Sequence, residues 1–475
     1  MGSGQVTDWQ GKHVTVAGLG VSGVPAAKAL HGLGARVTVV NDGDDARARE
    51  QAAELEALGI TVRLGDGATL PEGTDLIVTA PGWKPDKPLF AAADEAGVPV
   101  WGDVELAWRL RKPGAAPWLA VTGTNGKTTT VRMLAAILTA AGLRTAAVGN
   151  IGVSLLDAVL GEEEYDVLAV ELSSYQLHWA PSLRAHSAAV LNLAPDHLDW
   201  HGSMEAYARD KGRVYEGNRV ACVYNVDATD KPSTEDLVRE ADVEEGCRAV
   251  GFTLGTPGPS QLGVVEGLLV DRAFVENRHK NAQELAEVSD VHPPAPHNIA
   301  NALAAAALAR AFGVPAGAVR DGLRSFTPDA HRIAHVGDVD GVAYVDDSKA
   351  TNTHAAAASL AAYESIVWIA GGLAKGATFD ELVAESAKRL RGAVLIGRDR
   401  ALIREALARH APEVPVVDLG RTDTGAMLQA VQEARRLARP GDTVLLAPAC
   451  ASMDMFTNYN KRGDAFAQAV RELGA

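Results

Sequence analysis

The stretch Ala120-Val121-Thr122-Gly123-Thr124-Asn125-Gly126-Lys127-Thr128-Thr129-Thr130 decides the fold of this chain. Residues 118–121 form a continuous apolar run, which predicts a buried strand, and the apolar sequence from Val131 onward predicts a helix. A glycine-rich turn therefore joins the end of a strand to the beginning of a helix. Backbone N–H groups and the positive end of the helix dipole meet at such a turn, so it can bind a triphosphate.

Two side chains of this stretch complete a phosphate site. Lys127 supplies a positive charge, and Thr128 offers a hydroxyl to Mg²⁺. The spacing departs from the usual phosphate-binding loop, because Val121 stands where its first glycine is expected. The alternative is a helix capped after a glycine turn, but a cap needs neither the buried strand nor the Gly-Lys-Thr triplet. The sequence therefore predicts a variant phosphate-binding loop.

The length and composition indicate a multidomain globular protein. A chain of 475 residues predicts about three domains at roughly 150 residues each. No apolar segment reaches membrane-spanning length, and residues 1–10 lack the pattern of a signal peptide. The three cysteines are far apart in sequence and lack metal-ligand spacing, which favours reduced thiols. We therefore expect a cytoplasmic protein with no membrane partner.

The net charge of -15 argues against nucleic acid as a partner. Nucleotides and phosphates are anions too, so a site for them must be locally basic within an unfavourable overall field. The side chains available for this role, together with Mg²⁺, are Lys127, Arg332, Lys349 and Lys375.

The first part of the chain predicts a β-α-β unit with a second glycine-rich turn. A strand at 14–17 leads into Gly18-Leu-Gly20-Val-Ser-Gly23, and a strand at 37–40 ends at Asn41-Asp42. The pattern G-x-G-x-x-G fits a dinucleotide, but a UDP-sugar also carries a pyrophosphate, and a purely structural turn is a third possibility. A further strand at 76–79 ends in Ala80-Pro81-Gly82 at the carboxyl edge of the same sheet.

Two breaks divide the chain into three predicted domains. The first break is the Pro/Gly-rich linker at 111–117, directly before the strand predicted at 118–121, called the organising strand below. The second break falls near Thr327-Pro328-Asp329. We expect an α/β protein with a Rossmann-like domain at 1–113, a central P-loop-type sheet domain at 114–328 and a C-terminal Rossmann-like open sheet at 329–475. The central domain should include a small β excursion at 250–274 and a long helix from Pro296.

The strands predicted after these breaks are short apolar runs. In the central domain they are 145–148, 167–170 and 188–191, and in the last domain 342–345, 366–369, 393–396, 414–417 and 443–446. Polar side chains follow the ends of the central strands, where open parallel sheets bind ligands. They are Asn150, Glu171, Ser173, Ser174, Asp196, His197 and Asp199.

Glu171 and His197 are candidate metal ligands. Glu171 ends a buried strand, where a carboxylate can ligate Mg²⁺ on a triphosphate; a helix cap is the alternative, since Ser173 follows closely. His197 and His201 have a spacing that would suit zinc on a helix, but Pro195 and Gly202 predict a loop. A second Mg²⁺ site with His197 as a ligand is favoured over zinc, and a solvated histidine is the remaining alternative.

Three turns at the carboxyl edge of the last sheet can form an amino-acid site. The first, 346–352, mixes Asp, Lys and Thr, which suits a zwitterion; a helix N-cap with a surface lysine is the alternative. The turns at 371–375 and 450–452 repeat the strand-then-small-residue layout. We expect the three turns to converge.

The motifs together resemble those of the Mur ligase family of cell-wall peptide synthetases, in particular its D-glutamate-adding members. The resemblance covers essentially the whole chain. It rests on G-T-N-G-K-T-T at 123–129, G-N-I-G at 149–152, E-L-S-S-Y-Q-L at 171–177, D-H-L-D at 196–199, H-N-I-A-N-A-L-A at 297–304, D-S-K-A-T-N at 347–352 and P-A-C-A-S-M-D at 448–454.

The resemblance implies an ATP-dependent amide ligase of peptidoglycan precursor synthesis that uses ATP and two Mg²⁺ ions. Its substrates would be UDP-N-acetylmuramoyl-L-alanine and D-glutamate, bound by the first and third domains, with ATP in the second. The substrate carboxylate would be activated as an acyl phosphate, and the amine of D-glutamate would then displace phosphate. We expect a monomer.

The resemblance also implies roles for individual residues. Catalytic roles fall to Lys127, Glu171, His197 and Lys211, the last matching the lysine that the family carbamylates. The metal ligands would be Thr128, Glu171, His197 and carbamylated Lys211. ATP would contact Gly123, Thr124, Asn125, Gly126, Lys127, Thr128, Thr129, Asn298, Asn301, Arg332 and Asp347. The UDP-sugar would contact Val21, Ser22, Asp42, Gly82 and Asn150, and the amino acid Lys349, Thr351, Lys375, Ser452 and Tyr459.

One departure and several rival assignments remain. After Asp42 the chain reads Gly43-Asp44-Asp45, where a hydroxyl or basic residue is expected, so Asp44 and Asp45 are left out of the predicted site. Members that add diaminopimelate or lysine should show an Asp-Asn-Pro motif in the third domain, which this chain lacks, and folylpolyglutamate synthases lack the first domain. From other classes, an NAD-dependent dehydrogenase would leave residues 120–130 unexplained, and a non-catalytic nucleotide-binding protein would not need the turns of the third domain.

Overall fold

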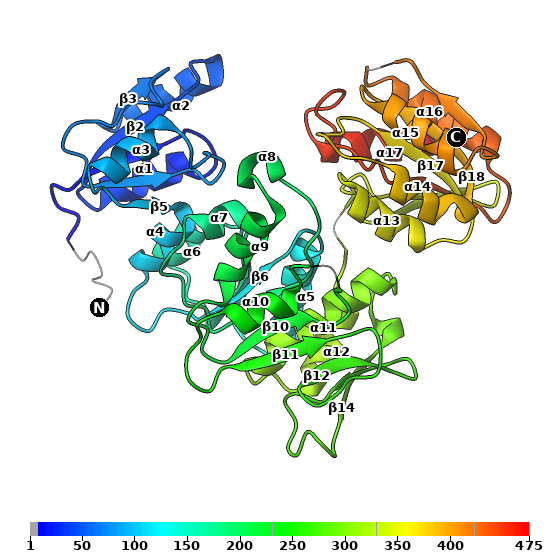
Figure 1. Ribbon diagram of the computed structural model, residues 1–475, viewed down its shortest axis with the longest axis horizontal. Helices are drawn as coiled ribbons and strands as arrows, with labels where there is room; N and C mark the ends of the chain where they lie inside the picture. The colour runs from blue at the N-terminus through cyan, green and yellow to red at the C-terminus, as the bar shows by residue number, and fades with distance from the viewer. Residues whose placement is uncertain (1–7, 230, 329, 422, 475) are drawn as a thin grey trace. The chain divides into compact units, whose positions relative to one another are not determined.

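The computed structural model describes residues 8–229, 231–328, 330–421 and 423–474 (Figure 1). The chain forms two compact units, one of residues 1–291 and 299–326, the other of residues 292–298 and 327–475. The described residues of these units form three sheets. The predicted domain boundaries at 113 and 328 stay predictions, and Asp329, named with the second break, lies outside the described residues.

The first sheet is a five-stranded parallel sheet in the order β3-β2-β1-β4-β5. Its strands are β1 His13–Ala17, β2 Arg36–Asn41, β3 Thr61–Leu64, β4 Leu76–Thr79 and β5 Val100–Gly102. Its helices are α1 Gly23–Gly32, α2 Ala46–Glu56, α3 Pro88–Glu95 and α4 Asp103–Leu110. The predicted Rossmann-like unit is confirmed. Asp45, left out of the predicted site, accepts a hydrogen bond from Ala48 N–H and caps α2.

The central sheet has nine strands in the order β14-β13-β12-β11-β10-β9-β6-β8-β7. They are β6 Trp118–Thr122, β7 Thr145–Gly149, β8 Val167–Glu171, β9 Ser187–Val190, β10 Ala221–Asn225, β11 Arg248–Phe252, β12 Gln261–Val265, β13 Leu268–Asp271 and β14 Gln283–Glu287. The helices of this part are α5 Lys127–Ala140, α6 Leu155–Leu160, α7 Ser174–His178, α8 Leu198–His201, α9 Met204–Gly212, α10 Thr234–Glu240, α11 Pro296–Ala311 and α12 Ala316–Ser325. The pairs from β7 to β12 are parallel, and β12, β13 and β14 pair antiparallel, which confirms the predicted β excursion.

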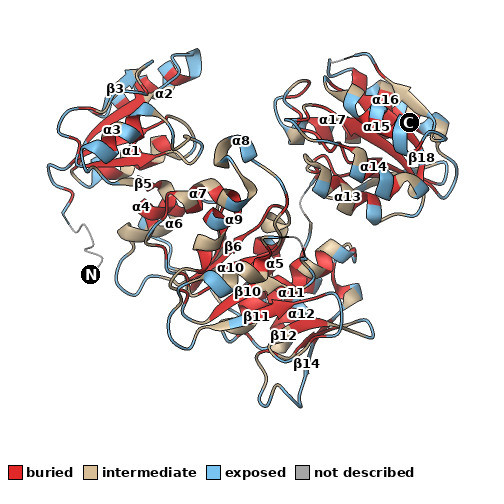
Figure 2. Cartoon of the chain, in the orientation of Figure 1, coloured by how far each residue is buried: buried red, intermediate tan, exposed pale blue. Residues whose placement is uncertain are grey.

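The organising strand β6 is buried along its whole length (Figure 2). Trp118 and Ala120 pack into the core on one face of the sheet, while Leu119 and Val121 pack into the core on the other. A strand covered on both faces needs apolar residues at every position, which is why this one reads as a continuous apolar run. The helix α11 fits against the second core because residues 302–309 are all buried, and six of them are alanine, which lets the backbone approach closely.

The third sheet has six strands in the order β15-β16-β20-β17-β18-β19, parallel except for β15. The strands are β15 Ala334–Val339, β16 Val342–Asp346, β17 Ile366–Gly371, β18 Leu390–Ile396, β19 Val416–Asp418 and β20 Thr443–Leu446. The helices are α13 Thr353–Ala361, α14 Asp380–Ser386, α15 Arg400–His410, α16 Ala426–Leu437 and α17 Tyr459–Leu473. The predicted open α/β sheet is confirmed.

Three details refine the sequence-based picture. The segment predicted as a loop around His197 contains the one-turn helix α8, so that prediction is wrong at 198–201; Gly202 ends the helix rather than excluding it. Cys222 and Cys247, distant in sequence, lie with their sulfur atoms 3.9 Å apart as free thiols, because β10 and β11 are neighbours in the sheet. Among the described residues, no helix has both the length and the apolar composition that a membrane crossing requires.

Candidate functional site

The predicted phosphate-binding loop follows β6, which lies between β8 and β9 near the middle of the parallel part of the central sheet. The helix α5 begins at Lys127, directly after Gly126, whose φ of 84° is left-handed. A Cβ at Gly126 would lie 2.3 Å from Asn301 Oδ1, so only glycine fits this backbone beside α11. The structure therefore confirms the strand, glycine turn and helix, and it brings the predicted nucleotide residue Asn301 to the loop.

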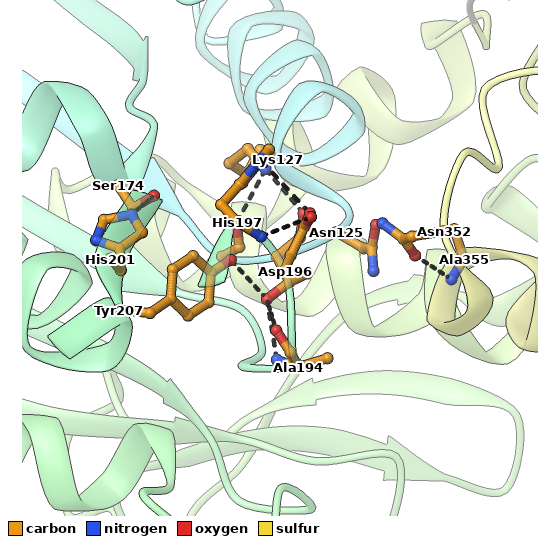
Figure 3. A network of polar contacts seen from close by, with 12 residues as sticks. Asn125, Lys127, Ser174, Ala194, Asp196, His197, His201, Tyr207, Asn352 and Ala355 are labelled. Carbon is orange, nitrogen blue, oxygen red and sulfur yellow. Dashed lines mark hydrogen bonds and ion pairs between the residues drawn. The ribbon is translucent and has the colours of Figure 1, made fainter. Parts of the chain in front are cut away.

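The loop is held by the segment that follows β9. Asn125 N–H donates to Asn192 Oδ1 at 2.9 Å, and Asn192 Nδ2 donates back to the carbonyl of Asn125 at 3.1 Å. The hydroxyl of Thr124 accepts from Ala194 N–H at 2.9 Å and lies 2.9 Å from the hydroxyl of Tyr207. Ala194 and Tyr207 are labelled in Figure 3. The backbone N–H of Thr124 also donates to the carbonyl of Asn192 at 3.1 Å, so both the side chain and the N–H of Thr124 fix the loop. Asn192 was not predicted, because its role depends on two strands that are adjacent in space.

Two lysines meet at the carbonyl of Gly123. Lys127 Nζ donates to the carbonyls of Gly123 and Thr124, both at 2.9 Å. Lys211 Nζ, on the buried face of α9, donates to the carbonyl of Gly123 at 2.8 Å. Burial and the nearby charge of Lys127 hold the pKa of Lys211 well below its usual value, and Asp196 and Glu171 offset this only in part. A buried amine that sheds its proton is a nucleophile, so this environment suits the predicted reaction with CO₂.

Glu171 lies at the end of β8, next to the loop strand, and is 2% exposed. Its Oε1 accepts from Asn150 Nδ2 at 3.0 Å, while its Oε2 is buried without a hydrogen-bond partner among the described residues. A buried carboxylate oxygen without a partner is costly unless a cation or donor meets it. The helix cap predicted as the alternative is made by Ser173, which forms a capping box with Gln176. Glu171 therefore fits a Mg²⁺ ligand, with the Thr128 hydroxyl on the first turn of α5 as a second oxygen donor.

His197 and His201 have different surroundings. His197 precedes α8 with a left-handed φ of 54°, its backbone N–H donates to Asp196 Oδ1 at 3.0 Å, and its side chain is 42% exposed. The ring of His201 is buried and bonds to Asp210 at 3.0 Å and to Ser174 at 2.9 Å. Because both ring nitrogens of His201 are engaged, the two histidines do not form a zinc pair, and only His197 is accessible to a ligand.

The residues predicted for the UDP-sugar follow strands of the first sheet, with Asn150 on the central sheet. Val21 is 85% exposed in the glycine turn, and the hydroxyl of Ser22 donates to Asp103 Oδ2 at 3.1 Å. The carbonyl of Gly82 accepts from Trp200 Nε1 at 3.3 Å. This contact joins the turn after β4 to α8, directly beyond His197.

Lys87 lies beside Asp42, in the region where the sequence lacks the expected basic residue. Lys87, at the N-cap of α3, forms an ion pair with Asp42 and lies over the ring of Trp83, 4.7 Å from its centroid. A basic side chain therefore lies beside Asp42, and it comes from 45 residues away in the sequence. Asp44 pairs with Arg49 on the surface, which agrees with leaving it out of the predicted site. No local pattern could have identified Lys87.

The three turns of the second unit converge, as predicted, because β16, β20 and β17 are neighbours. Leu373 and Ala451 exchange backbone hydrogen bonds of 2.9 Å in both directions, and Ala449 N–H donates to the carbonyl of Ala350 at 2.9 Å. The buried Arg462 of α17 joins two of the turns from behind. Its guanidinium donates to Ser348 Oγ at 3.0 Å, to the carbonyl of Ser348 at 2.8 Å and to the carbonyl of Cys450 at 3.0 Å.

The residues predicted around these turns differ in exposure. Lys349 Nζ lies 3.9 Å from the ring centroid of Tyr459, Ser452 is 4% exposed, and Lys375 is exposed with a left-handed φ of 50°. Burial raises the pKa of Asp347 to about 6, against the nearby charge of Arg332, and Ser359 donates a hydrogen bond to it.

The remaining predicted residues include one helix cap. Asn352 accepts from Ala355 N–H at 2.8 Å and caps α13, which confirms the capping alternative for that residue. Thr351 is half-buried directly before it. Asn298 Nδ2 donates to the carbonyl of Pro293 at 3.2 Å, within the short segment 292–298 that belongs to the second unit.

Comparisons with known proteins cover most of the chain. Residues 121–309 match the model of the Mur ligase middle domain, residues 331–450 that of the Mur ligase glutamate ligase domain, and residues 13–79 that of pyridine nucleotide-disulphide oxidoreductase. The last match spans β1 to β4 and reflects the dinucleotide-like glycine turn.

Two relatives match over their full length. The UDP-N-acetylmuramoylalanine--D-glutamate ligase of Streptomyces avermitilis is 88% identical, with 99% of this chain and 100% of the relative covered. The enzyme of the same name from Streptomyces coelicolor is 89% identical, again with 99% and 100% covered. Among solved structures, the MurF ligase of Thermotoga maritima in complex with ADP has a TM-score of 0.54 at 16% identity, covering 98% of this chain and 96% of that one. The structural match concerns the fold alone.

Proposed function

The chain belongs to the Mur ligase family, and from this premise we infer that it is an ATP-dependent ligase that adds D-glutamate to UDP-N-acetylmuramoyl-L-alanine. The observation that carries the inference is the identity of 88% over essentially the whole chain to a relative of that name. Such an enzyme makes a precursor of peptidoglycan.

ATP is proposed to bind at the loop before α5, with its phosphates on the loop N–H groups and the N-terminus of the helix. Lys127 would turn from the loop carbonyls toward the phosphates, where its charge offsets the charge that develops during transfer. Mg²⁺ supplies the Lewis-acid chemistry of phosphoryl transfer when bound, and Thr128, Glu171, His197 and carbamylated Lys211 are the residues proposed to hold two such ions. The buried Oε2 of Glu171, which has no hydrogen-bond partner in the part of the chain that the structure describes, supports this assignment.

The reaction is proposed to run in two steps. First, the carboxylate of the L-alanyl group attacks the γ-phosphorus of ATP, forming an acyl phosphate and releasing ADP. Second, the amine of D-glutamate attacks the acyl carbon, and the tetrahedral intermediate expels phosphate while the nitrogen loses its proton. An amine and a carboxylate alone form a salt rather than an amide, so the phosphate makes the carbonyl reactive. His197, whose side chain is 42% exposed, is proposed to help orient the amine.

The substrate sites are proposals of the same kind. Val21, Ser22, Asp42, Gly82 and Asn150 are assigned to the UDP-sugar, with Lys87 added because it stands beside Asp42. Asn298, Asn301, Arg332 and Asp347 are assigned to the nucleotide, and Lys349, Thr351, Lys375, Ser452 and Tyr459 to D-glutamate. The converged turns and the charge of Lys349 suit a dicarboxylic amino acid. We also propose domain boundaries near residues 113 and 328, a monomer, and a cytoplasmic location, which the free thiols support.

The test is phosphate release from ATP with UDP-N-acetylmuramoyl-L-alanine and one amino acid at a time. The parallel reactions contain D-glutamate, L-glutamate, L-alanine, meso-diaminopimelate or no amino acid. We expect release only with D-glutamate, and none with the Lys127→Ala variant. Release with another amino acid would keep the family and overturn the substrate, whereas no release in any reaction would overturn the proposed activity.

A further inference from the structure

A basic cavity of about 550 Å³ lies in the first unit, away from every residue assigned above. It is formed by the end of α4, the linker at 111–117, the loop before β9 and the loop before β10. Its basic side chains are Arg109, Arg111, Lys112, Arg184 and Arg219.

The cavity lies at the edge of the central sheet opposite to the candidate active site. Its lining residues Pro117, Arg184 and Arg219 come just before the first residues of the parallel strands β6, β9 and β10. The phosphate-binding loop, Glu171 and Asn192 come at or after the last residues of strands in the same sheet. A strand of four or five residues separates the two edges by about 15 Å. The cavity is therefore a separate site.

The cavity holds more positive charge than carboxylates of the described residues pair with. Arg109 pairs with the buried Glu105, but Arg111, Lys112, Arg184 and Arg219 have no ion pair among the described residues. Burial and the like charge of Arg219 lower the pKa of Arg111 to about 10. Four cations without an ion pair among the described residues are thus gathered against their mutual repulsion, in a chain whose net charge is -15.

The cavity is also built rather than a chance gathering of flexible side chains. The guanidinium of Arg111 stacks over Trp108, 3.3 Å from the ring centroid, and its Nε donates to the carbonyl of Trp108 at 3.3 Å. Arg184 donates to the carbonyl of Leu183 at 2.7 Å. Its aliphatic part packs on Gly217, where an added Cβ would lie only 1.7 Å from Cδ of Arg184. Two guanidinium groups are thus oriented by aromatic and backbone partners.

We propose that this cavity binds a small anion that carries at least two phosphate groups. Guanidinium groups make bidentate hydrogen bonds to phosphate oxygens, and a di- or triphosphate brings enough charge to offset several unpaired cations. The volume exceeds that of a single inorganic phosphate and suits a compound of nucleotide size. Such a ligand would bridge the segment after α4 to two loops of the central sheet.

The test is binding of inorganic pyrophosphate to the full chain by calorimetry. It is done in a Lys127→Ala background without added metal, so that the ATP loop does not contribute. The variants are Arg219→Gln and Lys112→Gln, which are exposed, and the matched control is Arg320→Gln, an exposed arginine of α12 outside the cavity. Thermal unfolding of each variant checks that it folds. A parallel titration with ADP distinguishes a nucleotide from a free diphosphate as the preferred ligand.

We expect pyrophosphate binding that Arg219→Gln and Lys112→Gln each weaken about tenfold and that Arg320→Gln leaves unchanged. The affinity should also fall steeply as salt increases, because several charges are neutralised. Absence of binding, or equal binding by the cavity variants and the control, would overturn the proposal.

Discussion

The amine of Lys211 donates a hydrogen bond of 2.8 Å to the carbonyl of Gly123, inside the loop that leads into α5. A lysine 88 residues away in sequence therefore contacts the same carbonyl oxygen as Lys127. Two ammonium groups in this position would repel each other, and burial adds to that cost. Both effects lower the pKa of Lys211 and so favour loss of its proton.

We predict that Lys211 reacts with CO₂ and that activity depends on the product. Adding ¹³C-bicarbonate should give a carbamate carbon signal in the NMR spectrum of the wild type that is absent from Lys211→Arg. Depletion of CO₂ should lower phosphate release, and bicarbonate should restore it. Lys280→Arg, at an exposed lysine, is the control and should keep the signal. Full activity of Lys211→Arg would contradict the prediction.

Glu171→Gln should lower activity about 100-fold or more, because the neutral amide is a poor Mg²⁺ ligand and cannot offset positive charge. The variant keeps the acceptor for Asn150, so its thermal unfolding should change little. A titration of phosphate release against Mg²⁺ checks this, and the variant should need a higher concentration. Glu164→Gln, at a carboxylate that is 83% exposed, serves as the control. Equal Mg²⁺ dependence in both variants would rule out the metal assignment.

Thr124→Val should destabilise the first unit by about 1–3 kcal/mol, because it leaves the N–H of Ala194 and the hydroxyl of Tyr207 without their partner in a buried place. Denaturant unfolding of the variant measures this. Tyr207→Phe removes the hydroxyl that Thr124→Val leaves without a partner. The stability lost in the double variant should therefore be smaller than the sum of the losses in the two single variants. Thr139→Val, exposed on α5, is the control and should be nearly neutral.

Arg462→Lys should raise the KM for D-glutamate about tenfold, since a lysine cannot reach Ser348 and the carbonyl of Cys450 together. The loss of these buried hydrogen bonds should also cost about 2–4 kcal/mol of stability. Steady-state kinetics and denaturation check the two effects. Arg471→Lys, at an exposed position of the same helix, should change neither. An unchanged KM would show that Arg462 does not support the amino-acid site.

Asp347→Asn should raise stability at neutral pH. Burial raises the pKa of Asp347 to about 6, so between about pH 4 and pH 6 the unfolded chain loses a proton that the folded chain retains. The wild type therefore loses stability as the pH rises from about 4 to about 6, and above pH 6 this loss stays constant. At roughly 1.4 kcal/mol per pKa unit the difference reaches the order of 3 kcal/mol.

Denaturation at several pH values tests this difference between wild type and variant. Trp368, buried in β17, reports on the second unit through a ¹⁹F-tryptophan signal. The stability difference should grow from pH 4 to pH 6 and then stay constant. A difference independent of pH would contradict the assigned ionisation.

Much of the fold could be predicted because its parallel strands are buried on both faces. Such strands read as apolar runs, and β6, β8 and β17 were identified within one or two residues of their observed ends. The edge strand β3 was missed because its residues alternate between exposed and half-buried, and β5 because it has only three residues. The one-turn helix α8 was missed because Pro195 and Gly202 flank it closely.

The candidate site likewise has parts that the sequence predicted and parts that it did not. The turn from Gly123 to Thr128 could be recognised because its residues are consecutive in the sequence. The end of a strand and the start of the next helix bind an anion with their own backbone groups, without a distant partner. The groups that support them come from elsewhere. Asn192 meets Asn125 across 67 residues, Lys87 meets Asp42 across 45, and Arg462 meets Ser348 across 114.

The sequence by itself determined the phosphate loop, the alternation of strands and helices, and the family of the chain, since each depends on residues that are neighbours in the chain. Only the tertiary structure decided which charges are buried together. Three features depend on the order of strands in the central sheet: the lowered pKa of Lys211, the oxygen of Glu171 that lacks a hydrogen-bond partner among the described residues, and the basic cavity before β6, β9 and β10. Strand order sets these distances, and no local pattern encodes it.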